Sequence, residues 1–166
     1  MKSADLKTIE KDVHKNREAL IERLVGFAVN DVLLFWSTDK KVHNEQEKKW
    51  TPIIAWANKT VKGSFKKTTG LEVLKENENM SLKFKEYLNK MTDKELSCFY
   101  VAALNMRSVL LALALIKGKI SALEAFELSE LEELYQARIW GSEPIAETRR
   151  NNIKDLLICT EQYLRT

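Results

Sequence analysis

The segment from Val101 to Ile116 is apolar at nearly every position and contains an unbroken apolar run, Val109 to Ile116. A helix that is apolar on all sides must be covered by other elements, because a surface helix keeps one polar face. The run is also much shorter than the ~20 residues that a membrane-spanning helix needs. The sequence therefore predicts a central core helix from Asp93 to Lys117, which ends at Gly118.

Residues that form tight turns are scarce, with five glycines and two prolines among 166 residues. A β-sandwich or barrel needs a turn signal roughly every 8–12 residues, so these folds are excluded. The chain length fits one domain on the usual scale of about 100–200 residues per domain. The sequence thus predicts an all-α fold in which residues 1–166 form a single orthogonal helical domain of about six helices.

Several helix boundaries are marked locally. Apolar residues recur at steps of three and four from Leu6 to Phe35, which predicts a long helix that ends near Trp36. Thr51 and Pro52 form an N-cap and first-turn pattern, so they start a new helix or kink an existing one.

The second half of the chain contains two capping boxes, Thr92 with Glu95 and Ser121 with Glu124. The latter predicts a helix from Ala122 to about Gly141, and Pro144 then opens the last helix. Residues 63–70 have no helical period and are expected to form an extended connector or a short strand.

Charge is unevenly distributed although the net charge is only +3. Residues 38–90 contain twelve basic and seven acidic side chains, whereas residues 120–137 contain five glutamates and no base. The basic stretch interleaves lysines with Trp50, Trp56 and Phe65, a mixture that occurs in nucleic-acid-binding proteins. A solvated surface over buried tryptophans is the simpler interpretation, and a nucleic-acid-binding module using residues 38–67 is the alternative.

Motifs for catalysis or metal binding are not visible. His14 and His43 have no convergent ligands at metal-site spacing, and there is no phosphate loop, nucleophile elbow or dinucleotide fingerprint. Cys98 and Cys159 lie in apolar helical patterns, as reduced thiols of a cytosol-like compartment do. We therefore expect no enzyme activity, metal, cofactor or small-molecule substrate.

The first ten residues mix lysines with acidic residues and contain no apolar segment, so no secretory signal or organellar presequence is expected. This favours a bacterial cytoplasm, with the mitochondrial matrix as the alternative for a processed chain. Membrane insertion is not expected.

Two charged residues lie within apolar helical patterns. Asp31 is interpreted mainly as a helix N-cap or a buried, hydrogen-bonded structural residue, and less readily as a general base. Arg107 is expected to extend to the surface or to pair with a glutamate of the 124–133 stretch.

The acidic stretch combines charge with an aromatic residue. Glu133, Gln136 and Trp140 are spaced at three and four residues, so a helix presents them on one face. Aromatic anchors beside a few oriented polar groups are typical of protein interfaces. The alternative is an ordinary solvated helix face.

Three stretches of the sequence resemble a known family, the assembly chaperones that hold the free alpha subunit of the F-type ATP synthase catalytic head. The similar residues are Asn30-Asp31-Val32-Leu33-Leu34; then Gln46, Trp50, Pro52, Trp56-Ala57 and Thr69-Gly70; then Ser108, Leu111 to Leu115, Gly118, Ala122, Ala125, Leu131-Glu132-Glu133, Tyr135-Gln136 and Trp140-Gly141. Arg149 follows where the family also tends to have arginines.

The resemblance departs from the family in two places. Family members usually carry an additional N-terminal β-rich domain, so this chain resembles their C-terminal helical domain. Met106-Arg107 also stands where the family usually has threonine and glycine.

The resemblance implies a binding protein that covers the apolar surface of the alpha subunit and is displaced when alpha joins beta. By position, the glutamate on which the family relies falls at Glu133, with Glu132 adjacent to it. The implied partner site is completed by Gln136, Trp140 and Gly141. Four further residues are implied as structural or binding residues: Asp31, Trp50, Pro52 and Trp56.

Overall fold

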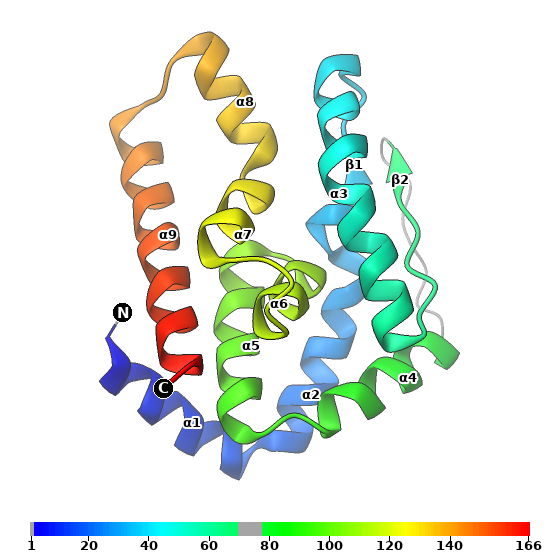
Figure 1. The fold of residues 1–166 in the computed structure, drawn as a ribbon, viewed down its shortest axis with the longest axis vertical. Coiled ribbons are helices and arrows are strands. Elements are labelled where there is room, and N and C mark those ends of the chain that lie inside the picture. The colour runs from blue at the N-terminus through cyan, green and yellow to red at the C-terminus, as the bar shows by residue number, and fades with distance from the viewer. Residues whose placement is uncertain (1, 70–77) are drawn as a thin grey trace.

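The computed structural model describes residues 2–69 and 78–166, and Gly70 of the family pattern lies outside them. This part of the chain contains nine α-helices, two short 3₁₀ helices and a pair of two-residue strands (Figure 1). The elements are α1 (Ser3–Lys15), α2 (Arg17–Gly26), η1 (Phe27–Asn30), η2 (Val32–Leu34), β1 (Phe35–Trp36), α3 (Lys40–Val61), β2 (Thr68–Thr69), α4 (Glu78–Asn89), α5 (Asp93–Met106), α6 (Val109–Ile116), α7 (Ala122–Ser129), α8 (Leu131–Trp140) and α9 (Pro144–Leu164). The predicted all-α class is confirmed.

Helix α6 lies at the centre of the core. All eight of its residues are buried, and it packs against α3, α5, α7 and α9. The apolar run of the sequence is therefore covered on every side, as its composition requires.

The predicted central helix from Asp93 to Lys117 is wrong in one respect, because it is two helices. Arg107 ends α5 in the left-handed conformation, with φ of 56°, and Ser108 then caps α6 by accepting a hydrogen bond from the Leu111 amide. The N-cap preference of serine interrupts the helix where the apolar pattern continues.

Three other predicted helices also differ from the structure. The helix expected to reach Trp36 breaks at Asn16 and ends at Gly26, where η1, η2 and β1 follow. The helix expected from Ala122 to Gly141 breaks at Glu130. Thr51 and Pro52 start no helix, since α3 begins after Asp39, whose carboxylate accepts hydrogen bonds from the backbone, and continues through Pro52.

The predicted capping boxes at Thr92 and Ser121 are both present, and α9 begins at Pro144 as expected. The connector at residues 63–70 contributes β2, which pairs in parallel with β1 so that Phe35 lies opposite Thr68 and Trp36 opposite Thr69. This small sheet fixes the segment that follows η2 against the rest of the fold.

The two ends of the described chain lie close together. Helix α1 packs against α5 and α9, and the Tyr163 hydroxyl donates a hydrogen bond to the Glu10 carboxylate. Figure 1 shows both ends at the opposite side of the molecule from the link between α8 and α9.

Candidate protein-binding site

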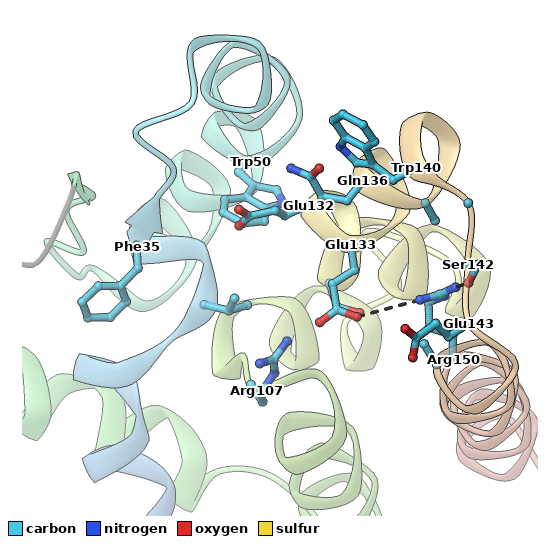
Figure 2. Close-up of a pocket in the computed structure, with 15 residues that line it drawn as sticks. Phe35, Trp50, Arg107, Glu132, Glu133, Gln136, Trp140, Ser142, Glu143 and Arg150 are labelled. Carbon is cyan, nitrogen blue, oxygen red and sulfur yellow. Dashed lines mark hydrogen bonds and ion pairs between the residues drawn. The ribbon is translucent and has the colours of Figure 1, made fainter.

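Helix α8 is the most exposed helix of the second half of the chain, and Leu131 is its one buried residue. Its face with Glu132, Glu133, Gln136 and Trp140 lines a cavity of about 500 Å³. We call this the α8 cavity (Figure 2). Its remaining lining residues are Val32, Phe35, Trp50, Arg107, Ser129, Ala137, Gly141, Ser142, Glu143, Ala146 and Arg150.

The residues predicted for partner binding are thus brought together. Glu132, Glu133, Gln136, Trp140 and Gly141 all line the α8 cavity. Helical spacing predicted the common face of Glu133, Gln136 and Trp140, because residues three and four apart lie side by side on a helix, whereas Glu132 and Gly141 were implied by the family resemblance.

Of the four residues predicted as structural or binding residues, one lines the α8 cavity and three do not. Trp50 lines the α8 cavity, although its side chain is 2% exposed and its indole N–H donates to the Leu128 carbonyl at 2.9 Å. Asp31, Pro52 and Trp56 lie outside the lining of the cavity. Trp56 packs half-buried against the core, and Pro52 is exposed on α3.

A group of charged side chains joins α8 to α9 at one wall of the cavity. The Arg149 guanidinium donates to both carboxylate oxygens of Glu130, at 3.2 and 2.9 Å, and also to Glu133. Glu130 is 2% exposed, so this bidentate contact neutralises a buried charge. The hydrogen bonds that Arg149 donates to Glu130, together with the nearby negative charges, raise the pKa of Arg149 above its usual value.

Glu133 also faces Arg150, whose guanidinium lies 4.0 Å from its carboxylate (Figure 2). Arg150 is buried and donates to the Ser142 hydroxyl in the link between the helices. The orientation of Glu133 is therefore set by two arginines of α9, while nearly half of its side chain is open to solvent.

Three large apolar side chains are exposed where α8 ends and α9 begins, and Trp140 among them lines the cavity. Trp140 is 81% exposed, Ile145 84% and Ile139 53%. Large apolar side chains exposed next to one another mark interaction surfaces on soluble proteins. We call these three residues the apolar tip.

Asp31 is a structural residue, as its main interpretation predicted. It caps η2 by accepting the Leu33 amide hydrogen bond at 2.9 Å, and its other oxygen accepts from the Leu110 amide at 2.9 Å. Ser108 donates to it at 2.8 Å. Burial raises the pKa of Asp31 to about 6, and the donated hydrogen bonds oppose that rise.

Arg107 extends to the surface, which was one of the two predictions made for it. Among the residues that the structure describes, it forms no ion pair, so the predicted pairing with a glutamate is wrong. Glu133 is instead held by Arg149 and Arg150. The backbone position is left-handed, which accounts for the glycine that the family pattern has there.

Sequence reasoning missed Ser142, Glu143 and Arg150 as cavity residues. They lie in the link after α8 and on α9, so their position depends on how the two helices pack. The adjacent arginines Arg149 and Arg150 beside an acidic helix were the available signal.

The basic stretch supports the simpler interpretation of its aromatic residues. Trp50 and Phe65 are 2% and 3% exposed, so neither ring is available for stacking on a base. The nucleic-acid alternative gains no support from this arrangement.

Within residues 2–69 and 78–166, no three or more His, Cys, Asp or Glu side chains come close enough to share a metal ion. In the same ranges, every helix is too short or too polar to cross a bilayer. Both cysteines are free thiols, and burial raises the pKa of Cys98 to about 12.

A helical scaffold with an exposed tryptophan, apolar neighbours and a charged cavity has the features of a protein-binding protein. Comparison with known proteins agrees with that class. The family model described as ATP12 chaperone protein matches residues 2–58.

Solved structures extend the likeness to most of the chain. Atp12 from Paracoccus denitrificans superposes with a TM-score of 0.89 at 22% identity, over 95% of this chain and 68% of that protein. A mutant of P. denitrificans Atp12p gives 0.90 at 22% identity, with the same coverage. A protein from Agrobacterium tumefaciens gives 0.84 at 23% identity, over 95% of this chain and 59% of that one.

These structural matches establish the shared fold, and the family model adds a sequence match in the first third of the chain. The chain is therefore similar to ATP12 chaperone proteins in sequence over residues 2–58 and in fold over most of its length.

Proposed function

We propose that this chain is an assembly chaperone of the ATP12 type for ATP synthase. It binds the free alpha subunit of the catalytic head, prevents its aggregation and releases it when alpha joins beta. We further propose that residues 1–166 act as one helical domain equivalent to the C-terminal domain of the family. The ATP12 family match and the shared fold support this proposal.

One observation carries the functional part of the proposal. Five residues implied by the family resemblance line one cavity next to the apolar tip. An unassembled subunit of an obligate complex exposes an apolar surface that promotes aggregation. A protein with its own exposed apolar residues, rimmed by charges, is suited to cover such a surface.

The apolar tip supplies the attractive part of binding. A tryptophan buries about 150–250 Å² when it is fully covered, which makes Trp140 the strongest single candidate for an anchor. Because the tip is already exposed in the free chain, binding needs no unfolding of the core.

The charged cavity supplies orientation and release. Glu133 is held in place by Arg149 and Arg150, so a partner meets a carboxylate of fixed direction. A contact of a few anchors with a charged rim is displaced by mass action when beta offers a larger matched interface.

Substitutions at the site test the proposal through the aggregation of purified alpha subunit. Trp140→Ala is expected to weaken capture about 30-fold, or ~2 kcal/mol, without loss of stability, since the side chain is already 81% exposed. Glu133→Lys reverses the oriented charge and is expected to abolish protection. Light scattering of alpha with increasing chaperone concentration measures both effects.

Two further variants make the result interpretable. Glu133→Gln removes the charge of Glu133 while keeping its shape, and it avoids placing a lysine against the two arginines. Glu86→Lys makes the same charge reversal at an exposed position of α4, away from the cavity. This variant is expected to protect the alpha subunit normally. Normal protection by Trp140→Ala and Glu133→Lys would remove this site from the mechanism, and failure of the unmodified chain to protect alpha would reject the function.

A further inference from the structure

Arg107 lies where two cavities meet. It lines the α8 cavity and also a second cavity of about 350 Å³. The walls of the second cavity, which we call the α5–α6 cavity, are mainly apolar and contain no acidic side chain: Phe27, Asn30, Ala103, Leu104, Ser108 and Val109.

The backbone at Arg107 is in a conformation that side chains other than glycine rarely adopt. Its φ is 56°, and its carbonyl accepts a hydrogen bond from the Val32 amide at 3.0 Å, so the conformation is fixed by η2. Strained backbone positions that persist in a well-packed region are found preferentially at functional sites. A side chain is retained here at a position where glycine is energetically preferred.

The guanidinium has no anionic partner within the described parts of the chain. Glu133, the acid across the α8 cavity, is engaged by Arg149 and Arg150. Figure 2 shows the Arg107 guanidinium pointing into the cavity, between the segment that carries Phe35 and the helix that carries Glu133. Its planar set of donors is therefore available to a bound molecule.

The surroundings define the charge of that molecule. Glu132, Glu133 and Glu143 line the α8 cavity and repel a doubly charged anion such as a phosphate more strongly than a single carboxylate. A single carboxylate that approaches from the α5–α6 cavity avoids these acids. The apolar walls on that side reduce solvent screening of the contact and leave room for an apolar side chain next to the carboxylate.

We propose that Arg107 determines the specificity of the docking site by binding a carboxylate of the partner, while an apolar side chain beside that carboxylate fills the α5–α6 cavity. The occupant is an acidic residue with an apolar neighbour on the alpha-subunit surface. The identity of this occupant rests on the proposed function, whereas the carboxylate contact itself does not.

Arg107→Gly tests the contact without endangering the fold. The substitution removes the guanidinium and places glycine at a left-handed position, so the melting temperature is expected to stay the same or rise. Affinity for alpha is expected to fall roughly tenfold, and Arg107→Lys, which keeps the charge without the bidentate geometry, is expected to be intermediate.

Lys62→Gly is the matched control. Lys62 is the other non-glycine residue with positive φ in the described chain, at 54°, and is an exposed cation at the end of α3. Its replacement is expected to have the same effect on the backbone and to leave affinity for alpha unchanged.

A small probe tests the contact independently of alpha. N-acetyl-leucine carries an isobutyl group next to a carboxylate, and N-acetyl-leucinamide lacks the charge. In a nuclear magnetic resonance titration, the carboxylate is expected to shift the Arg107 Nε–H signal and the backbone signals of Leu104 and Val109 in the unmodified chain. The amide is expected to give much smaller shifts, and Arg107→Gly is expected to abolish the backbone shifts.

Each result decides a separate point. If the unmodified chain captures alpha and Arg107→Gly captures it equally well, Arg107 has no role in docking. If the unmodified chain does not capture alpha, the proposed function is wrong, and the titration alone decides the carboxylate contact. Equal shifts with the carboxylate and the amide would overturn that contact.

Discussion

Asp31 joins two distant parts of the chain through its carboxylate. One oxygen accepts from the Leu33 amide and the Ser108 hydroxyl, and the other accepts from the Leu110 amide. These donors belong to η2 and to the first turn of α6, so one side chain organises both. Complete burial of the carboxylate opposes ionisation and raises its pKa to about 6.

The stability of the chain relative to Asp31→Asn is expected to depend on pH. The folded-state pKa of about 6 lies above the ordinary aspartate value of 3.8, so the contribution of Asp31 is present at low pH and is lost as pH rises from 3.8 through 6. The difference in unfolding free energy should therefore decrease by about 3 kcal/mol in total between about pH 2 and pH 8, with about 2 kcal/mol of the decrease between pH 4 and pH 6. Urea unfolding of both proteins across this range measures it.

The other carboxyl groups titrate in both proteins. Their contribution therefore cancels in the difference between the unfolding free energies of the unmodified chain and of Asp31→Asn. A difference that is independent of pH, or that grows as pH rises, would contradict the raised pKa of Asp31.

Helix α8 is sparsely buried, and ion pairs of Glu133 join it to α9. One of its residues is buried, cavities lie on two of its sides, and the arginines of α9 hold Glu130 and Glu133. Sparse burial lowers the free energy of local opening. The element that carries four of the five residues predicted for partner binding is thus sparsely protected against opening.

Removal of the Arg149 contact is expected to release α8 before the rest of the fold. Arg149→Met leaves the carboxylate of Glu130, which is 2% exposed, without its bidentate partner, and should cost about 2 kcal/mol. Amides of α8 should exchange with solvent roughly 30-fold faster than in the unmodified chain, while α5 changes little. Hydrogen exchange followed by mass spectrometry resolves the two helices.

Lys83→Met, which removes an exposed cation of α4, serves as the control and should leave α8 unchanged. Equal acceleration in α5 and α8 would mean that Arg149 stabilises the whole fold and does not act locally on α8.

The helices were predictable wherever the signal was local. The capping boxes at Thr92 and Ser121 use residues three positions apart, and Pro144 fits the first turn of α9. At the break after α7, Glu130 pairs with Arg149, which lies 19 residues away, and at the break after α5, the carbonyl of left-handed Arg107 accepts a hydrogen bond from the distant Val32 amide. The apolar periodicity continues across both breaks, so the sequence pattern alone predicts an uninterrupted helix at each of them.

The candidate site also has a part that is predictable from local sequence and a part that is not. The shared face of Glu133, Gln136 and Trp140 follows from helical spacing within one element. The opposite wall, with Phe35 and Arg107, comes from segments that only the tertiary fold brings together. Glu133, the acid across the cavity from Arg107, already pairs with Arg149 and Arg150. The spacing of residues in the sequence carries no information about which arginine pairs with which acid.

At the scale of the whole molecule, α6 connects the surrounding elements. It packs against α3, α5, α7 and α9, and its eight residues are all buried. A substitution inside α6 therefore disturbs the packing of several helices at once, which favours cooperative unfolding of the whole core.

Leu113→Ala is expected to destabilise the whole fold by about 3–5 kcal/mol, because Leu113 is completely buried and its truncation leaves a cavity in the core. Leu82→Ala, at a site 55% exposed, should cost less than about 0.5 kcal/mol. Chemical denaturation followed by far-ultraviolet circular dichroism measures both. A small or multiphasic loss for Leu113→Ala would show that the helices unfold independently.

The position of the chain ends has a practical consequence. Both described ends meet beside α1 and α9, at the opposite side of the molecule from the apolar tip. A fluorescent label or a surface tether attached at either end therefore stays away from the α8 cavity. Immobilised molecules oriented through these ends all present the cavity toward the bulk solution, and two molecules joined end to end direct their cavities away from each other.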